Sequence, residues 1–194
     1  DLEWQGMQMF VDNGVAEDDP RMSVVYEHFE DNLRDIVDTL HAKGMHVVLS
    51  TVPVNLRQSA PFLSIGRDDL SASDEAKLAA LRERAEAQAL NGRWREAQDL
   101  WQQAIALDAG HADSHFQLAT SLENLGEFAL ARSHYERALD LDGLRFRADT
   151  RINVIIERVA RGYDSSDVSF VNSSKGFDRA SAPYAPGRDL LVEH

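Results

Sequence analysis

The chain has 194 residues, of which 43% are hydrophobic, and this is enough for one or two packed domains. Its 33 acidic and 20 basic residues give a formal charge of −13, which disfavours nucleic acid and anionic lipid as partners. The absence of cysteine excludes disulfides, thiolate metal sites and a cysteine nucleophile, and no apolar run reaches the roughly 18 residues that a membrane span needs.

The opening segment predicts a helix followed by a strand. Asp19 and Pro20 supply an N-cap and a first-turn proline, and apolar residues at helical spacing continue to Leu40, so the helix should end at Gly44. The β-branched run 46–52 predicts a strand buried on both faces. Residues 53–73 are rich in turn formers and predict a long loop at the carboxyl end of that strand, where α/β sheets bind ligands.

The middle of the chain contains a sequence motif that occurs twice. A glycine, an aromatic residue, an alanine, an aromatic residue and an alanine recur after 34 residues, a period typical of helix-turn-helix repeats. We expect helices near 74–91, 94–107, 112–125 and 128–141, with the repeated aromatic residues packed in the core. The two copies are Gly92, Trp94, Ala97, Trp101 and Ala104, and Gly126, Phe128, Ala131, Tyr135 and Ala138.

This repeated unit resembles the tetratricopeptide repeat. The resemblance implies two repeats, at about 78–109 and 112–143, within an insert that spans 72–143. Because two repeats are fewer than such arrays usually need to stand alone, one face of the insert should pack on the rest of the protein. We expect the charged run 145–151 to form ion pairs that dock the insert, with a phosphate or carboxylate site as the alternative.

Beyond the repeats, the order of helix and strand returns. Apolar residues from Ile152 to Val159 predict a helix that ends at Gly162, residues 167–171 predict a second strand, and 172–188 predict an irregular connection. The simplest interpretation is one α/β domain interrupted by the insert. The runs 46–52 and 167–171 should then be neighbouring parallel strands.

The flanking segments 18–62, 144–162 and 185–194 resemble the SGNH or GDSL-like hydrolases, in the subgroup that carries tetratricopeptide repeats. The resemblance implies a partial flavodoxin-like parallel sheet formed by residues 1–71 and 144–194. Members of this family cleave or transfer acyl esters with a serine nucleophile, an oxyanion hole and a late Asp-x-x-His pair. The acyl ester would be the substrate, and no cofactor is expected.

The sequence departs from that family at the reacting groups. No Gly-Asp-Ser and no Gly-x-Asn-Asp occurs, and the chain opens on Asp1, so we interpret it as a fragment that is inactive by itself. Glu193 and His194 are the candidate catalytic residues, with a solvated terminus as the alternative. Asn55 and Arg57 are candidate substrate-binding residues, with side-chain capping of the loop as the alternative.

Two classes of function follow from these patterns. The first is an ester hydrolase or acyltransferase whose repeats recognise a substrate or partner. The second is a non-catalytic scaffold whose repeats bind a protein or peptide. His111 and His115 have the spacing of metal ligands on one helix face, but a third ligand is not evident, so we expect no metal site. The sequence indicates no cellular location.

Overall fold

The computed structural model describes residues 8–181 and 185–191, which divide into two compact units. The first, which we call the repeat unit, consists of Leu56–Arg145 and the described part of Asp1–Glu17. The second, which we call the strand unit, consists of Asp18–Asn55 and the described part of Phe146–His194. In the part of the chain so described, no helix combines the length and apolarity needed to cross a membrane.

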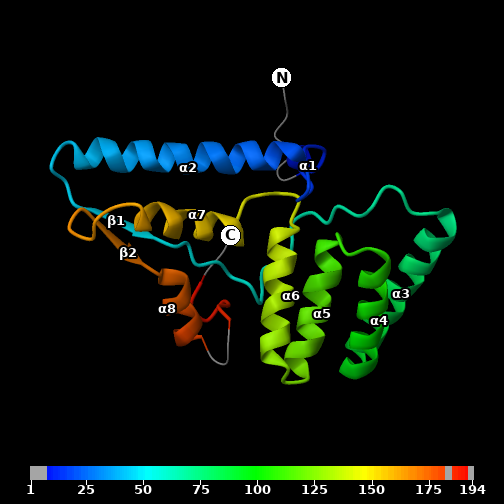
Figure 1. Cartoon of the computed structure of the whole chain (residues 1–194). Coiled ribbons are helices and arrows are strands. Elements are labelled where there is room, and N and C mark those ends of the chain that lie inside the picture. The colour runs from blue at the N-terminus through cyan, green and yellow to red at the C-terminus, as the bar shows by residue number, and fades with distance from the viewer. Residues whose placement is uncertain (1–7, 182–184, 192–194) are drawn as a thin grey trace. The chain divides into compact units, whose positions relative to one another are not determined.

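The repeat unit is built from two helical hairpins in sequence (Figure 1). Its helices are α3 (Ala72–Leu90), α4 (Trp94–Leu107), α5 (Ala112–Asn124) and α6 (Phe128–Asp140), and each contacts the next. The short α1 (Gln8–Val11) belongs to the same unit. The four predicted helices are therefore confirmed, with boundaries within about two residues of those expected from the sequence.

The hairpins form because glycine and alanine occupy the crowded positions. Gly92 and Gly126 turn the chain with φ angles of +70° and +78°, a region that residues with a Cβ rarely adopt. Ala104 and Ala138 are buried where the helices approach closely. Trp101 and Tyr135 fill the adjacent space and are 1% and 2% exposed, so their assignment to the core is confirmed.

The other two repeated aromatic residues are less buried than the period predicts. Phe128 is 38% exposed and Trp94 is only partly buried. Both are the first residues of their helices, beside the hairpin turn, where fewer neighbours surround the ring. The prediction that they belong to the core is wrong for Phe128 and holds only in part for Trp94.

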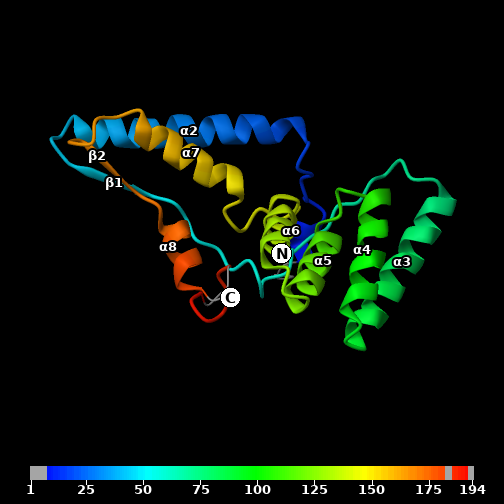
Figure 2. The same ribbon diagram turned by 60° about the horizontal axis from the view of Figure 1, so that its bottom comes forward.

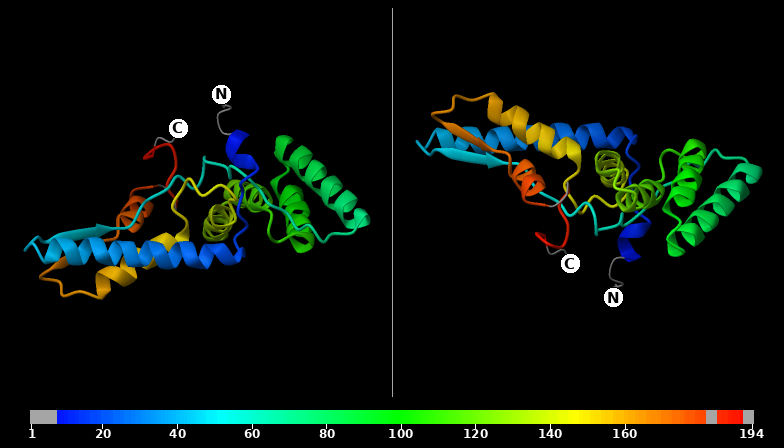
Figure 3. Two further views of the ribbon diagram at one scale, coloured as in Figure 1. Left: turned by 90° about the horizontal axis from the view of Figure 1, so that it is seen from above. Right: turned by 90° about the horizontal axis from the view of Figure 1, so that it is seen from below.

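The strand unit packs two helices against a pair of strands (Figure 2). Its elements are α2 (Pro20–His41), β1 (Val47–Ser50), α7 (Thr150–Arg161), β2 (Val168–Val171) and α8 (Ser173–Ala180). The strands are parallel, with Val47 opposite Val168, so the predicted pairing is confirmed. In Figure 3, α2 lies in front of the strands when seen from above and behind them when seen from below.

The core of the strand unit lies between α2, α7 and one face of the strands. Val37, Ile155 and Val159 are almost completely buried there. At the start of α7, the Asp149 carboxylate caps the helix by accepting from the Ile152 backbone N–H at 3.0 Å, and it also accepts a hydrogen bond from the Tyr26 hydroxyl. A buried polar contact therefore joins the first and last segments of this unit.

The predicted α/β fold class is wrong. The described residues are mostly helical and form a sheet of only two strands, so the partial flavodoxin-like sheet does not form. The prediction that the run 46–52 is buried on both faces is also wrong, because Val48 is 60% exposed while Val47 and Leu49 are buried. Side chains along this strand are alternately buried and exposed, as expected for a sheet that is covered on one face only. The sequence does not show this alternation, because nearly all of its residues are apolar.

The segment after β2 also differs from the prediction. The serine, glycine and proline content of residues 172–188 predicts an irregular connection, but α8 occupies Ser173–Ala180. The Asn172 side chain accepts a hydrogen bond from the Lys175 backbone N–H at 2.9 Å and so caps this helix. The serines thus mark a helix N-terminus, a role that composition does not separate from a loop.

Candidate functional site

In the repeat unit, the loop that precedes α3 lies against α5. Near the carboxyl end of α5, Arg57 Nε is 3.3 Å from Glu123 Oε1. Near the amino end, Ser64 Oγ accepts a hydrogen bond from the Asp113 backbone N–H at 2.8 Å. Residues 57–64 therefore run along α5 in the opposite direction to the helix.

Asp142 fixes the middle of this loop. Its carboxylate is buried and accepts hydrogen bonds from the backbone N–H groups of Phe62 and Leu63, at 3.0 and 3.1 Å, and of Leu144, at 3.1 Å. Asp142 also forms an isolated antiparallel bridge with Ser64. A single buried carboxylate thus ties the loop to the residues that follow α6.

A glycine allows the close approach at this point. A Cβ added to Gly143 would lie 2.7 Å from Ile65 Cδ1, a distance at which a neighbour must move. The Gly143 backbone N–H donates to the Leu63 carbonyl at 2.8 Å, and the Gly143 carbonyl accepts from the Val15 N–H at 3.0 Å. The loop is consequently part of the packed repeat unit.

Where the loop passes from α5 to α3, it borders a cleft of about 290 Å³. We call this the α3 cleft. Residues of α3, of the loop and of the turn between α4 and α5 line it, and all belong to the repeat unit. Its polar lining comes from Ser64, Arg67, Glu75, Arg82, Asp108 and His111.

An ion pair between the buried Asp108 and the partly exposed Arg82 lines the α3 cleft. Asp108 is 1% exposed and accepts a hydrogen bond from the Gly110 backbone N–H at 3.1 Å. Its other oxygen lies 3.4 Å from Arg82 Nη2, which is long for a charged hydrogen bond. Burial lowers the pKa of Arg82, although Asp108 acts in the opposite direction. A Cβ on Gly66 would meet Asp108 Oδ2 at 2.8 Å, so any larger residue there would require the Asp108 carboxylate to move.

His111 lies at the edge of the same cleft as the N-cap of α5. Its Nδ1 accepts a hydrogen bond from the Ser114 backbone N–H at 3.2 Å and lies 3.0 Å from Ser114 Oγ. Since Nδ1 is an acceptor, the neutral ring carries its proton on Nε2. Burial lowers the pKa of His111 and the Arg82 charge lowers it further, so the ring is a neutral donor at physiological pH.

His115 does not join His111 in a metal site. It pairs with His134 of α6, with 2.9 Å between the two Nδ1 atoms, and its Nε2 lies 3.2 Å from the Ala109 carbonyl oxygen. Burial lowers the pKa of His115 to about 4. In the chain as described, no three metal-ligating side chains gather.

The candidate site residues named from the sequence have separate positions. Glu193 and His194 lie outside the described residues. Asn55 belongs to the strand unit and is buried, and its backbone carbonyl accepts from Arg147 Nη1 at 3.3 Å. Arg57 belongs to the repeat unit and pairs with Glu123. Both contacts are those expected of residues that hold a loop, and a role in substrate binding stays a prediction.

The charged run 145–151 makes contacts inside each unit. Arg145 Nη1 donates to the Asp140 carbonyl at 2.6 Å in the repeat unit. In the strand unit, the Arg151 guanidinium lies 4.3 Å from the centre of the Tyr26 ring. The expected docking of an insert through this run stays a prediction.

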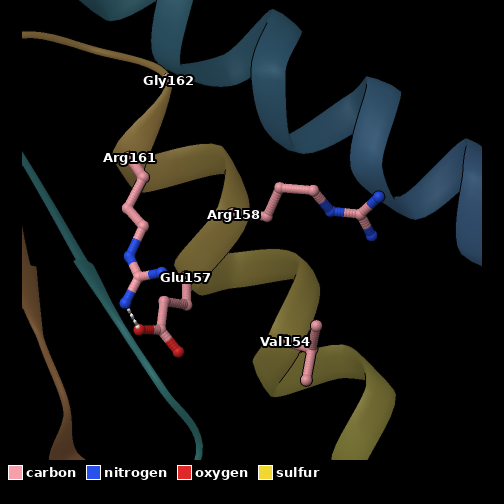
Figure 4. A pocket seen from close by; sticks show the side chains of 5 residues that line it. All are labelled: Val154, Glu157, Arg158, Arg161 and Gly162. Atoms are coloured by element: carbon pink, nitrogen blue, oxygen red, sulfur yellow. Dashed lines mark hydrogen bonds and ion pairs between the residues drawn. The ribbon is translucent and has the colours of Figure 1, made fainter.

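A second cleft, of about 330 Å³, lies on α7 (Figure 4). Arg158 lies 3.1 Å from Glu30 of α2, and Arg161 forms an ion pair with Glu157 one turn earlier. Val154 adds an exposed apolar side chain to the same surface. Each guanidinium therefore already has a carboxylate partner, which makes this cleft a weaker candidate than the α3 cleft.

No sequence pattern singled out Arg82 or Asp108. Arg82 lies between the buried Leu81 and Ala85 of α3. An arginine next to the buried face of a helix was the one feature of the sequence that could have indicated its partial burial. Asp108 follows α4 and looks like an ordinary turn acid. Its burial depends on the loop at Gly66, which no local pattern indicates.

Comparison with known families gives one match, over residues 112–144, to the tetratricopeptide repeat. No match was found among curated proteins or among solved structures. The match spans α5 and α6 and agrees with the helical architecture, whereas nothing found supports the resemblance to SGNH hydrolases. The repeat unit therefore carries a segment, Ala112–Leu144, that is similar to the tetratricopeptide repeat.

Proposed function

We propose that residues 72–143 form a protein-interaction module that binds a peptide segment of a protein partner. The observation that carries this proposal is the match of 112–144 to the tetratricopeptide repeat, in a hairpin that packs on a second hairpin of the same 34-residue period. Stacked helical repeats present an extended surface, which is how such proteins commonly bind their partners.

The surface next to α3 is the part on which we place the partner. The face of α5 near Glu123 and Asp113 is already contacted by the protein's own loop. On α3, by contrast, Glu83, Arg84 and Glu86 are exposed. A partner that extends along α3 would therefore meet polar side chains and the α3 cleft without displacing residues 57–64.

A peptide selection tests this proposal. The full chain is used to select binders from a displayed library of random 12-residue peptides, and the affinity of each synthetic peptide is measured by calorimetry. Hydrogen exchange then maps the contact. We expect micromolar binding and slower exchange in α3 and in residues 64–70.

Three outcomes would contradict it. These are a failure to recover any peptide with saturable binding, protection confined to the strand unit, and unchanged binding to a variant in which Glu83 and Glu86 of α3 are both replaced by Lys. A variant with Asp31→Lys and Asp35→Lys on α2 gives the same change in charge and serves as the matched control.

The esterase or acyltransferase activity, its acyl-ester substrate and the role of Glu193 and His194 stay predictions of the sequence resemblance. No observation on the described residues favours them, and the sheet that the resemblance implied does not form. We therefore propose the interaction module alone.

A further inference from the structure

We propose that the free edge of β1, together with an adjacent cleft on α2, binds an extended segment of a partner protein as an added β-strand. The segment alternates apolar side chains, which face α2, with basic ones. This surface belongs to the strand unit, so the inference does not depend on the interaction module proposed for residues 72–143.

The first observation is the unpaired edge of β1. The backbone N–H groups of Val47 and Thr51 donate towards β2, with distances of 2.9 and 3.1 Å to their carbonyl acceptors. Because successive residues of a strand direct their backbone groups to opposite edges, those of Val48 and Ser50 point away from β2. In the part of the chain that the structure describes, these groups have no backbone partner. They offer two donors and two acceptors at the spacing that another strand needs.

Apart from its short length, β1 lacks the features that protect an edge strand. Such strands usually carry a proline, charged side chains or a bulge. The sequence of β1 is VVLS, and its four residues pair with β2 in continuous register. Val48 is also 60% exposed on the uncovered face. An apolar and uncharged edge of this kind is a template for pairing with another chain.

The second observation is the position of α2 relative to the strands. α7 contacts both strands, whereas α2 contacts α7 and β1. Neighbouring helices pack about 10 Å apart, which is roughly twice the spacing of neighbouring strands. α2 therefore covers the position beside β1 where one more strand would run. The two helices thus cover a wider sheet than the two strands form.

The third observation is a cleft of about 530 Å³ on the same helix, which we call the α2 cleft. Its lining residues are Asn32, Asp35, Ile36, Thr39 and Leu40. Ile36 is 56% exposed. At about 100° per residue, it lies on a different side of α2 from Glu30, which is 3.1 Å from Arg158 of α7. Apolar side chains of an added strand would cover Ile36 and Leu40.

Charge determines which segment fits best. Among the residues that line the α2 cleft, only Asp35 is charged. Asp31 is a further exposed acid of α2, and the whole chain has a formal charge of −13. Complementary charge speeds association and disfavours partners of the same sign. A segment with basic side chains is therefore favoured over an acidic one.

A synthetic peptide tests this surface on the full chain. The probe is a capped seven-residue peptide in which lysine and valine alternate, with lysine at both ends. Amide hydrogen exchange is measured by NMR with and without the peptide. The Val48 and Ser50 amides should exchange rapidly in the free protein and at least about tenfold more slowly when the peptide is saturating. The amides of Val47 and Thr51, which are already bonded, should change less.

Two N-methylated peptides separate strand addition from simple charge attraction. One is methylated at the nitrogen of the central valine, and the other at the nitrogen of the lysine before it. Only one of these N–H groups faces β1 in an added strand, so one methyl group should weaken binding at least about tenfold and the other should be tolerated. With the valines facing α2, loss for the lysine derivative indicates an antiparallel strand and loss for the valine derivative a parallel one.

Matched variants locate the edge. Val48→Pro removes the outward N–H without removing a hydrogen bond to β2, so binding of the peptide should fall at least about tenfold. Val48→Thr keeps this N–H and should leave the affinity within about twofold. Circular dichroism and thermal unfolding establish that each variant is folded.

A second pair of variants tests the α2 cleft without changing β1. Ile36→Ala removes apolar surface that the added strand would cover, and it should weaken binding severalfold. Val154→Ala, which changes a residue of α7 that is 59% exposed, is the control and should have no effect.

Several results would overturn the inference. These are the absence of peptide-induced protection at Val48 and Ser50, equal effects of the two N-methyl groups, and equally tight binding of a peptide with glutamate in place of lysine. Sedimentation velocity tests another occupant. A dimer of the free chain in which the Val48 and Ser50 amides are already protected would show that a second copy, rather than a partner, pairs with β1.

Discussion

The two units of this protein reach a packed core by different means. In the repeat unit, alanines allow helices to approach, and large aromatic side chains such as Trp101 and Tyr135 fill the remaining space. In the strand unit, aliphatic side chains of α2 and α7 cover one face of two short strands, and the other face exposes Val48. In the repeat unit, the helices that pack on one another are therefore separated by about 34 residues or fewer in the sequence. The two paired strands are more than 100 residues apart.

The largest expected effect is in the repeat unit. Trp101→Ala should lower the free energy of unfolding by about 3–5 kcal/mol, because it removes a large side chain that is 1% exposed and leaves a cavity. Urea denaturation followed by circular dichroism measures the change. Trp94→Ala, which removes the partly buried aromatic residue beside the hairpin turn, is the control and should cost clearly less. Similar losses for both would show that Trp101 does not fill the core of the hairpin more completely than Trp94 does.

Removing the carboxylate that fixes the loop should have the next largest effect. Asp142→Ala leaves three backbone N–H groups without their acceptor, which we expect to cost about 3 kcal/mol. Hydrogen exchange should become faster at Phe62 and Leu63 first. Asp99→Ala, which replaces an exposed aspartate of α4, serves as the control and should leave exchange at Phe62 and Leu63 unchanged. Unchanged exchange at Phe62 and Leu63 in Asp142→Ala would show that the loop is held by other contacts.

Acid should weaken the repeat unit more than the strand unit. The pKa of His115 is lowered from 6.5 to about 4, mainly by burial, with His134 and Arg137 acting in the same direction and Asp108 and the Ala109 carbonyl opposing them. In the folded protein the His115 imidazole stays neutral down to about pH 4, whereas in the unfolded chain it takes up a proton near pH 6.5. The contribution of neutral His115 to the free energy of unfolding is therefore fully present above pH 6.5 and is lost as the pH falls from 6.5 towards 4. The loss should be about 2 kcal/mol.

Thermal unfolding between pH 7 and pH 4 measures this effect. Replacing His115 with Phe should flatten the decline without removing it, since burial also lowers the pKa of His111 and His134. The lowered pKa of Asp19, at about 2, places its titration below this range. An equally steep decline in the His115→Phe variant would rule out His115 as the cause.

The smallest effect should distinguish the two faces of the strand pair. Val48→Thr should change the free energy of unfolding by less than about 0.5 kcal/mol, because the side chain is 60% exposed. The adjacent Leu49 is buried, and Leu49→Ala should cost about 2–4 kcal/mol. Equilibrium denaturation of both variants measures the difference. Comparable losses would mean that both faces of the strand are covered.

The candidate site was much less predictable than the helices. Gly92, Gly126 and the alanines of the two repeat copies indicated the hairpins because their spacing reflects local steric requirements. Arg82 and Asp108 are 26 residues apart, and the depth of their burial depends on a loop that passes at Gly66. No periodicity connects these positions, so only the folded chain shows that they share a cleft.

The sequence by itself determined the elements whose causes are local: four repeat helices, α2 with its Asp19 cap, and the two β-branched runs that become strands. Tertiary structure alone decided that the sheet of the described residues stops at two strands, that Val48 faces outward, and that Asp142 holds the loop against the repeats. The physical reason is that helix caps, turns and periodicity depend on neighbours within a few residues. Burial and buried hydrogen bonds depend on which distant segments meet.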